Sequence, residues 1–492
     1  MLRKIRLVLA TLFFTLITLL FLDFTGTIHA WFDWMAKIQF LPAVLALNLG
    51  VVALLIILTL IFGRIYCSVI CPLGVFQDIA AWVGKQNKKN RYSYSPALSW
   101  LRYGMLAVFI VAMLAGFGSL AALLAPYSSY GRIANNLFAP VYQGLNNILA
   151  YFAERMDSYA FYETDIWIKS MPTFIIAIAT FIIIGVLAWK NGRTYCNTIC
   201  PVGTVLGFLA RFSWFKPVID TSKCVNCKLC EKNCKASCID IKNHKIDYSR
   251  CVDCMDCIDK CKKGAISYTH RVATAAKTQD KDIDKSRRTF LTTTAFLTAS
   301  SVLKAQEKKV DGGLAVIADK KAPKRNTHIV PPGASGIRHF AQHCTACQLC
   351  VSVCPNKVLR PSSDITRLMQ PEMSYEFGYC RPECAKCAEV CPTDAIHLTD
   401  LAEKSATQIG HAVWIKDNCV PLTDGEECGN CARHCPSGAI QMVPSDAGNP
   451  ASPKIPVINE ERCIGCGACE NLCPARPFSA IYVEGHEKHR II

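Results

Sequence analysis

The chain has 492 residues, of which 51% are hydrophobic, and its mean hydropathy is +0.23. This length predicts two to four domains, and the gathering of apolar residues in the first 190 positions argues against a wholly water-exposed protein. The formal net charge is +16, but no basic stretch belongs to a nucleic-acid-binding motif, so we expect no nucleic-acid partner.

Four apolar stretches near the N-terminus are long enough to cross a bilayer. They cover residues 7–24, 41–62, 105–125 and 173–189, and Asp23 is the only Lys, Arg, Asp or Glu within them. No A-x-A site follows the first, which argues against a cleaved signal peptide. Lys and Arg gather before the first, after the second and after the fourth, so the positive-inside rule assigns these positions to the cytoplasm.

Helical spacing of apolar residues predicts a helix over 136–155 in the long outer loop. It would either lie on the outer membrane face or pack against the bundle.

Two segments of this region match almost residue for residue. Residues 63–74 read GRIYCSVICPLG and residues 192–203 read GRTYCNTICPVG, which predicts a duplicated pair of spans. The motifs supply four cysteines: Cys67, Cys71, Cys196 and Cys200. These thiols could share one metal site, act as redox dithiols or belong to docking loops. The arginines of the motifs, Arg64 and Arg193, either offset thiolate charge or mark the inner interface.

Twenty-four of the 29 cysteines form six sets of four, five of them spaced near C-x₂-C-x₂-C-x₃-C. The sets are Cys224, Cys227, Cys230 and Cys234; Cys251, Cys254, Cys257 and Cys261; Cys344, Cys347, Cys350 and Cys354; Cys380, Cys384, Cys387 and Cys391; Cys419, Cys428, Cys431 and Cys435; and Cys463, Cys466, Cys469 and Cys473. This is the ligand pattern of cubane clusters, so we predict six [4Fe–4S] clusters. Zinc ribbons use two separated pairs and disulfide scaffolds use dispersed cysteines, so both fit worse. The remaining Cys238 is interpreted as a small buried residue beside a cluster rather than a spare ligand.

Between the second and third sets, residues 286–291 read SRRTFL and a moderately apolar stretch follows to residue 303. This pattern resembles a twin-arginine export signal, and a linker helix is the alternative. The signal predicts that the last four sets lie outside the cytoplasm, held by an uncleaved fifth membrane segment. The Lys- and Pro-rich residues 304–332 are interpreted as a linker.

The predicted fold class is therefore an α-helical membrane bundle of four spans plus a fifth anchor, with α+β ferredoxin-like iron–sulfur domains. The predicted domains are a four-span domain with both C-x₃-C-P motifs (1–215), a cytoplasmic two-cluster module (216–275), a signal anchor with linker (276–335) and a periplasmic four-cluster domain (336–492). The predicted location is the bacterial cytoplasmic membrane.

These motifs together resemble a fusion of the NapH and NapG ferredoxin-type proteins of periplasmic nitrate reductase systems. Residues 1–275 resemble NapH in their spans, C-x₃-C-P motifs and two cysteine sets. Residues 286–492 resemble NapG in the twin-arginine start, the PPGA segment at 331–334, the four sets and the C-x₈-C opening of the third. MauM, MauN and the C-terminal part of NosR are also similar.

The resemblance implies oxidation of quinol, such as menaquinol, drawn from the membrane quinone pool. It also implies a periplasmic acceptor, either a reductase such as nitrate reductase or a cytochrome. A factor that supplies electrons to mature or reactivate a partner metalloenzyme remains the alternative. We name no catalytic residue, because the spans lack an obvious ionisable side chain.

In two-cluster ferredoxins the fourth cysteine of one set ligates the neighbouring cluster. We therefore expect Cys261 to join the first set and Cys234 to join the second. By resemblance to other four-cluster subunits, the first outer set would pair with the last and the second with the third. The two groups of clusters would lie on opposite sides of a hydrocarbon core of about 30 Å. Either a quinone or a metal at the C-x₃-C-P cysteines bridges part of that gap, or the cytoplasmic module handles a separate electron source.

Overall fold

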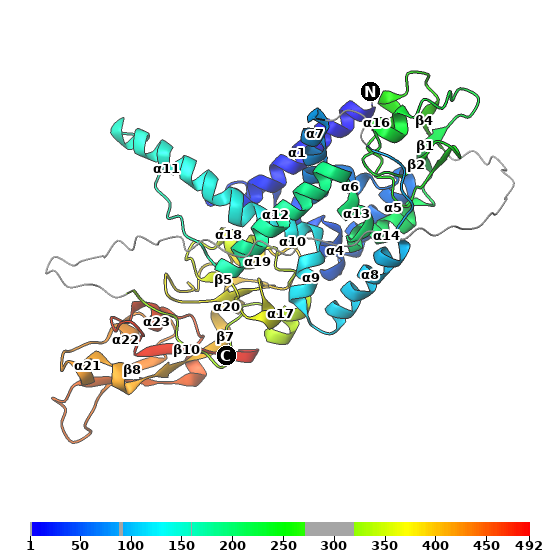
Figure 1. Cartoon of the computed structure of the whole chain (residues 1–492). Coiled ribbons are helices and arrows are strands. Elements are labelled where there is room, and N and C mark those ends of the chain that lie inside the picture. Colours follow the sequence, from blue (N-terminus) through cyan, green and yellow to red (C-terminus); the bar gives the residue numbers. More distant parts are fainter. Residues whose placement is uncertain (1, 88–91, 159, 271–318) are drawn as a thin grey trace, which may run out of the picture.

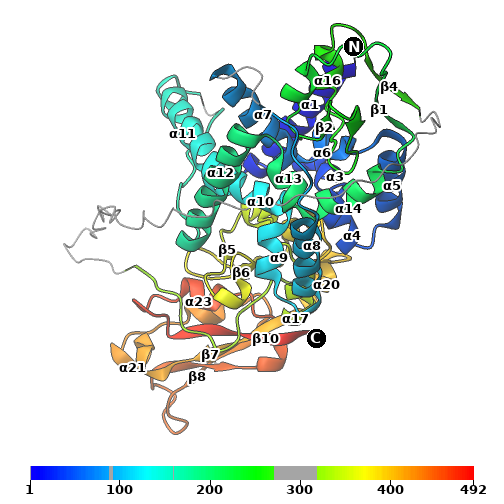
Figure 2. The same ribbon diagram turned by 45° about the vertical axis from the view of Figure 1, so that its right-hand side comes forward.

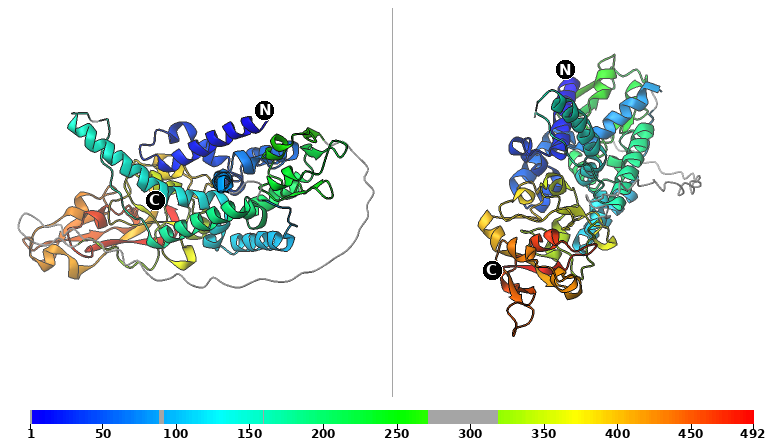
Figure 3. Two further views of the ribbon diagram at one scale, coloured as in Figure 1. Left: turned by 45° about the horizontal axis from the view of Figure 1, so that its top comes forward. Right: turned by 90° about the vertical axis from the view of Figure 1, so that its left-hand side faces the viewer.

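The computed structural model describes residues 2–87, 92–158, 160–270 and 319–492. It has a helical domain (residues 2–212), a two-set module (215–270) that carries the first two cysteine sets, and a four-set module (319–492) that carries the others. The helical domain lies between the two modules (Figures 1 and 3). The predicted export signal at 286–303 falls outside the described residues.

Two helices extend from one module to the other. Helix α1 (Leu2–Leu22) and helix α12 (Met171–Asn191) have 21 residues each and are long and apolar enough to cross a membrane. At 1.5 Å per residue each is about 30 Å long. Arg3 near the start of α1 pairs with Asp256 of the two-set module at 2.9 Å, whereas Phe21 near its end lies beside Gly131, where the backbone of the four-set module also comes close. Helix α12 runs the opposite way.

The second and third predicted spans are each interrupted, so four continuous spans are not confirmed. The second divides into α4 (Phe40–Leu45) and α5 (Leu49–Phe62), because the Asn48 side chain accepts a hydrogen bond from the Val51 amide and starts a new helix. The third divides into α8 (Ser99–Leu114) and α9 (Gly118–Leu124). Gly116 separates them with a φ of 77°, which glycine adopts without strain.

The predicted duplication is visible in the order of elements. In each copy a long apolar helix is followed by a short helix and then by a helix that begins at proline. The first copy comprises α5, α6 (Ile65–Val69) and α7 (Pro72–Asn87), and the second comprises α12, α13 (Thr194–Thr198) and α14 (Pro201–Ala210). Helices α6 and α13 lie side by side at the centre of the molecule (Figures 1 and 2).

The remaining helices of this domain connect the two copies or follow α1. Short helices α2 (His29–Phe32) and α3 (Trp34–Lys37) precede α4. Helix α10 (Pro126–Ile133) continues through the π-helix η1 (Ala134–Phe138) into α11 (Ala139–Arg155). The helix predicted over 136–155 is thus confirmed as α11, which projects away from the body of the molecule with Val141, Leu145, Ile148 and Phe152 exposed (Figure 1).

The two modules are small α+β units built from antiparallel strand pairs. In the two-set module, β1 (Phe215–Ile219) pairs with β4 (Ile266–His270) and β2 (Ile239–Asp240) pairs with β3 (Lys245–Ile246); its helices are α15 (Leu229–Lys232) and α16 (Asp256–Lys260). In the four-set module, the pairs are β5 (Leu359–Pro361) with β6 (Pro371–Met373), β7 (Thr407–Trp414) with β10 (Ile481–Ile491), and β8 (Ile440–Pro444) with β9 (Lys454–Ile458). Its α-helices are α17 (Ile337–His343), α18 (Leu349–Val353), α19 (Lys386–Glu389), α20 (Leu401–Ala406), α21 (Val420–Thr423), α22 (Asn430–Arg433) and α23 (Ala468–Leu472).

The described part of the predicted linker belongs to the four-set module. Ile329 and Val330 are each 1% exposed, and the Ile329 carbonyl accepts a hydrogen bond from the Met373 amide. The four-set module therefore begins before residue 336, because this segment buries apolar side chains that a free linker would leave in water.

A buried carboxylate joins the helical domain to the two-set module. Asp78 on α7 accepts from Arg193 at 2.7 Å and Arg6 at 2.8 Å, and pairs with Lys235 at 3.1 Å. Burial opposes ionisation of Asp78, but the three cations together hold its pKa well below the usual range. Asp256, which also pairs with Lys235, extends this network.

We predict that Asp78→Asn destabilises the protein by about 3–5 kcal/mol, because three buried cations lose their shared counter-charge. The midpoint of thermal unfolding of the detergent-purified protein measures the effect. Asp33→Asn is the matched control: the Asp33–Lys37 pair is solvent-exposed and should contribute less than about 1 kcal/mol. Equal shifts for the two variants would refute the structural role of Asp78.

Candidate iron–sulfur centres

The backbone of the cysteine loops has a recurring shape that suits cluster binding. In four loops the residues on both sides of the second cysteine have positive φ: Asn226 and Lys228, Asp253 and Met255, Ala346 and Gln348, and Gly465 and Gly467. Six of these eight are not glycine, and each such residue costs on the order of 1–3 kcal/mol. Successive amides in this conformation form a concave nest that favours anions such as iron–sulfur clusters.

The two-set module exchanges its fourth cysteines as predicted. One small cavity is lined by Cys224, Cys227, Cys230 and Cys261. A second is lined by Cys234, Cys251, Cys254 and Cys257. Each cavity therefore takes three thiols from one loop and one from the other, which is the arrangement of two-cluster ferredoxins.

The four-set module pairs its loops differently from the prediction. Cys354 of the first set lies with Cys380, Cys384 and Cys387, and Cys391 lies with Cys344, Cys347 and Cys350. Cys473 lies near Cys419, Cys428 and Cys431, whereas Cys435 lies near Cys463 and Cys466.

The pairing of the first set with the last and of the second with the third was thus wrong. The first set pairs with the second and the third with the fourth, because a short hairpin links the two loops of each pair. These hairpins are β5–β6 and β8–β9.

The four cysteine sites of this module follow one another. The site of Cys344 and Cys347 lies next to the helical domain, where the Cys347 backbone approaches Gly131. Cys354 and Cys391 then connect it to the cavity of Cys380, whose amide donates to the Cys466 carbonyl at 2.9 Å. The site of Cys419 is reached last, through the exchanged Cys435 and Cys473. The four sites therefore form a single row that leads away from the helical domain.

Cys238 is buried between two predicted ligands. It is 1% exposed, its sulfur lies 3.5 Å from that of Cys234, and it also contacts Cys251. This placement agrees with a small buried residue at the edge of a cluster site.

The four C-x₃-C-P cysteines meet inside the helical domain. Cys67, Cys71, Cys196 and Cys200 are each 3–4% exposed and lie among one another. We call this group the four-cysteine centre. Reciprocal contacts hold it: Arg193 donates to the Cys67 carbonyl at 2.7 Å, and Arg64 donates to the Cys196 carbonyl at 3.3 Å. Each arginine thus fixes the cysteine loop of the other copy.

The centre has the donor set and charge balance of an iron–sulfur site. Gln77 donates to the Cys196 sulfur at 3.2 Å. Arg64 is fully buried, and its guanidinium forms no ion pair with a carboxylate among the described residues; it contacts the Cys67 sulfur at 3.8 Å. Since buried charges are normally paired, thiolates that held an anionic cluster here would supply the missing negative charge.

The four-cysteine centre lies between the two modules. On one side, the Arg64 amide donates to Asp253 at 2.8 Å and its guanidinium donates to the Ser249 carbonyl at 3.1 Å; burial raises the pKa of Asp253 to about 6. On the other side, Arg132 is fully buried between Tyr195, which neighbours Cys196 and Cys200, and Cys347 of the four-set module.

Burial also determines the protonation of cysteines in the four-set module. Burial raises the pKa of Cys347 and of Cys466 to about 12, so both thiols are protonated at neutral pH until a ligand binds. Cluster binding must therefore release protons and become stronger as pH rises.

Several residues at these sites carried no motif that could identify them. Gln77, Arg132 and Lys169 occupy positions set by packing between distant segments. Lys169 donates to the carbonyl of Val351, which lies in the first set of the four-set module, and burial lowers the pKa of Lys169 to about 8. Lys235 could have been singled out from the sequence, because it directly follows the fourth cysteine of its set, where each of the four outer sets has proline.

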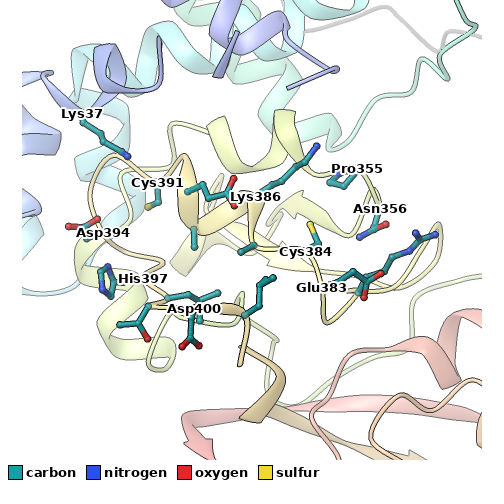
Figure 4. Close-up of a pocket in the computed structure, with 17 residues that line it drawn as sticks. Lys37, Pro355, Asn356, Glu383, Cys384, Lys386, Cys391, Asp394, His397 and Asp400 are labelled. Carbon is teal, nitrogen blue, oxygen red and sulfur yellow. The ribbon is translucent and has the colours of Figure 1, made fainter. Parts of the chain in front are cut away.

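A polar cleft of about 690 Å³ opens beside the second loop of the four-set module. Cys384 and Cys391 lie in it, with Lys37 of the helical domain on one side and His397 and Asp400 on the other (Figure 4). This cleft brings water close to two cysteine sites, so these sites are less isolated than the four-cysteine centre.

Comparisons with known proteins agree with these loops. A family described as "4Fe-4S binding domain" matches residues 44–91 and 171–220, which contain the two C-x₃-C-P motifs. A "4Fe-4S dicluster domain" family matches residues 426–476. No solved structure matches the chain.

The similar curated proteins are ferredoxin-type proteins. NapF of Escherichia coli K12 is 27% identical over 178 residues, which cover 36% of this chain and 99% of the relative. The methylamine utilization ferredoxin-type protein MauM is 31% identical in Methylobacillus flagellatus (33% of this chain, 70% of the relative) and 31% in Paracoccus denitrificans (32% and 73%).

The loops and their relatives define an iron–sulfur electron-transfer protein. More particularly, the chain belongs to the ferredoxin-type family that includes MauM.

We predict that paired Cys→Ser variants distinguish shared from separate sites. Cys354→Ser with Cys380→Ser removes two ligands of one site, so iron analysis should show a loss of about four atoms per chain. Cys344→Ser with Cys354→Ser is the matched control; it touches two sites and should lose about eight. Equal losses would contradict the exchange of fourth cysteines.

Proposed function

We propose that this chain is a membrane-bound protein that oxidises quinol and passes electrons along its cysteine sites to a periplasmic redox partner. The observation that carries the proposal is the position of the four-cysteine centre between the two modules. A further part of the proposal is that the chain combines the organisation of NapH and NapG.

The surface of the helical domain supports a membrane location. Leu12, Leu54, Val111 and Ile183 are each more than half exposed, and apolar surface of this extent is typical of membrane contact. With α1 and α12 as spans, the modules would lie on opposite faces: the two-set module in the cytoplasm and the four-set module in the periplasm.

The centre would shorten the passage between these faces. The helices between the modules are about 30 Å long, and bound iron–sulfur clusters supply one-electron redox chemistry. Arg64 connects the centre to Asp253, which stands between Cys251 and Cys254. Arg132 reaches Cys347 on the other side. Together these contacts divide one long step into two shorter ones.

The order of sites in the four-set module supports an exit at its far end. Cys428 and Cys431 of the last site are partly exposed, so a partner can approach them. The acceptor in this proposal is a periplasmic reductase, such as nitrate reductase, or a cytochrome.

We predict that Cys71→Ser with Cys200→Ser blocks electron passage between the modules. Freeze-quenched EPR after mixing with a menaquinol analogue should show reduced sites in the two-set module, and the rate of reduction in the four-set module should fall by at least about 100-fold, because the shared site is lost. Ser68→Ala, a buried change on the same short helix α6, is the control. Normal reduction of the four-set module would overturn the bridging role.

Sustained turnover separates a respiratory protein from a maturation factor. With excess quinol analogue and a soluble electron acceptor, the wild-type protein should turn over many times. A single turnover that only activates a partner metalloenzyme would instead support the maturation role.

We predict that protease added to intact spheroplasts cleaves the four-set module and spares the two-set module. Immunoblots with tags at the C-terminus and within 242–245 follow the two parts, and lysed spheroplasts provide the control. A C-terminal tag that resists protease until lysis would contradict this topology.

A further inference from the structure

A pocket of about 330 Å³ opens between α1, α7 and the two-set module. Its apolar wall includes Leu7 and Phe14 of α1 and Ile79 and Trp82 of α7. Leu7, Ile79 and Trp82 are 41%, 44% and 62% exposed, so the wall continues onto the apolar outer surface of the helical domain. These helices and α16 lie together near the N-terminus (Figure 1). An apolar ligand can therefore enter from the side.

The inner end of the pocket is polar and charged. Arg6, Asp78, Lys235 and Asp256 line it. Arg6 is 5% exposed, and although its Nη1 reaches Asp78 and the Ser68 carbonyl, its Nε has no hydrogen-bond partner among the described residues. A buried donor without a partner costs about 1–3 kcal/mol, so a ligand that offers an acceptor oxygen here would be stabilised.

This polar end adjoins a cysteine site. Lys235 follows Cys234 directly, and Asp256 stands between Cys254 and Cys257. All three cysteines line the neighbouring cavity. A ligand in the pocket would therefore lie next to the site nearer the four-cysteine centre.

We propose that this pocket binds quinol, a site that deepens the proposed function and depends on it. The apolar wall holds the ring and the start of the isoprenoid tail, while Arg6 and Lys235 donate to the ring oxygens. The volume suits a ring of this kind, since ligand pockets span about 300–1,000 Å³.

The neighbouring cysteine site would accept the electrons that quinol releases in this pocket. Both O–H bonds of quinol break to give quinone, and the two protons leave through the polar end. Two electrons pass, one at a time, to the oxidised iron–sulfur cluster that Cys234, Cys251, Cys254 and Cys257 would hold. Between the two transfers this cluster passes the first electron to the next site along the proposed path to the periplasmic redox partner, and the second electron follows.

The larger cleft of the four-set module does not share these properties. Its lining includes Lys37, Glu383, Lys386, Asp394 and Asp400 (Figure 4). Such a charged lining suits a polar ligand or a protein surface rather than an isoprenoid quinol.

Thr11→Trp tests the pocket, because Thr11 lines it and is solvent-exposed, so the larger side chain can enter without disturbing a core. Binding of a fluorescent hydroxyquinoline N-oxide, a quinol analogue, to the purified full chain is measured by quenching. We expect Kd to rise at least about tenfold, equivalent to about 1.4 kcal/mol. Leu9→Trp, on the same helix and outside the pocket, should change Kd less than about twofold.

Arg6→Gln provides the polar test and should also weaken binding of the analogue, with the EPR spectrum of the dithionite-reduced protein unchanged. If neither Thr11→Trp nor Arg6→Gln affects binding while quinol still reduces the wild-type protein, the pocket assignment is overturned and the proposed function stands. If both variants lose binding but quinol never reduces the wild-type protein, the binding site stands and quinol oxidation fails.

Discussion

Two buried arginines, one from each copy of the repeat, hold the centre of this protein together through reciprocal hydrogen bonds. Arg64 of the first copy holds the cysteine loop of the second, and Arg193 of the second copy holds that of the first. Neither guanidinium can reach water, so each must be satisfied within the structure. Arg193 uses Asp78, whereas Arg64 has sulfur and carbonyl groups. Four thiols therefore lie close together, and the buried guanidinium of Arg64 beside them requires a negative charge to balance it.

The same arginines attach the two-set module. Arg64 donates its amide to Asp253, and Arg193 donates its amide to the Lys235 carbonyl at 2.7 Å. One pair of contacts thus sets both the four-cysteine centre and its distance from the nearest module. The four-set module uses a separate surface around α10 and η1, where Asn136 of η1 donates to Gln348 at 2.9 Å. The helical domain thus holds the four-cysteine centre between the cysteine sites of the two modules.

Cysteine spacing predicted much of the site because ligand loops are local structures. A run such as Cys224 to Cys230 must form a tight loop, and the ferredoxin pattern then implies the exchange with Cys261. The pairing of distant loops was harder to predict from the sequence. The partner of the first outer set depends on the β5–β6 hairpin, and the analogy with other four-cluster subunits gave the wrong partner. The helix breaks at Asn48 and Gly116 likewise depend on capping and φ rather than on hydropathy. Arg132 has no sequence signature, since packing alone brings it to Cys347.

Two glycines, Gly63 and Gly192, end the repeated helices with φ of 72° each. A Cβ on either would collide with the two-set module, at Asp253 and at the Lys235 backbone respectively. The Asp253 side chain therefore lies directly on the main chain at Gly63, and the Lys235 main chain lies directly on that at Gly192. Because the contact at Gly192 is between two stretches of main chain, no rotamer change could make room for a side chain there. Substitutions elsewhere on this interface can alter its chemistry while leaving the spacing between the module and the four-cysteine centre unchanged.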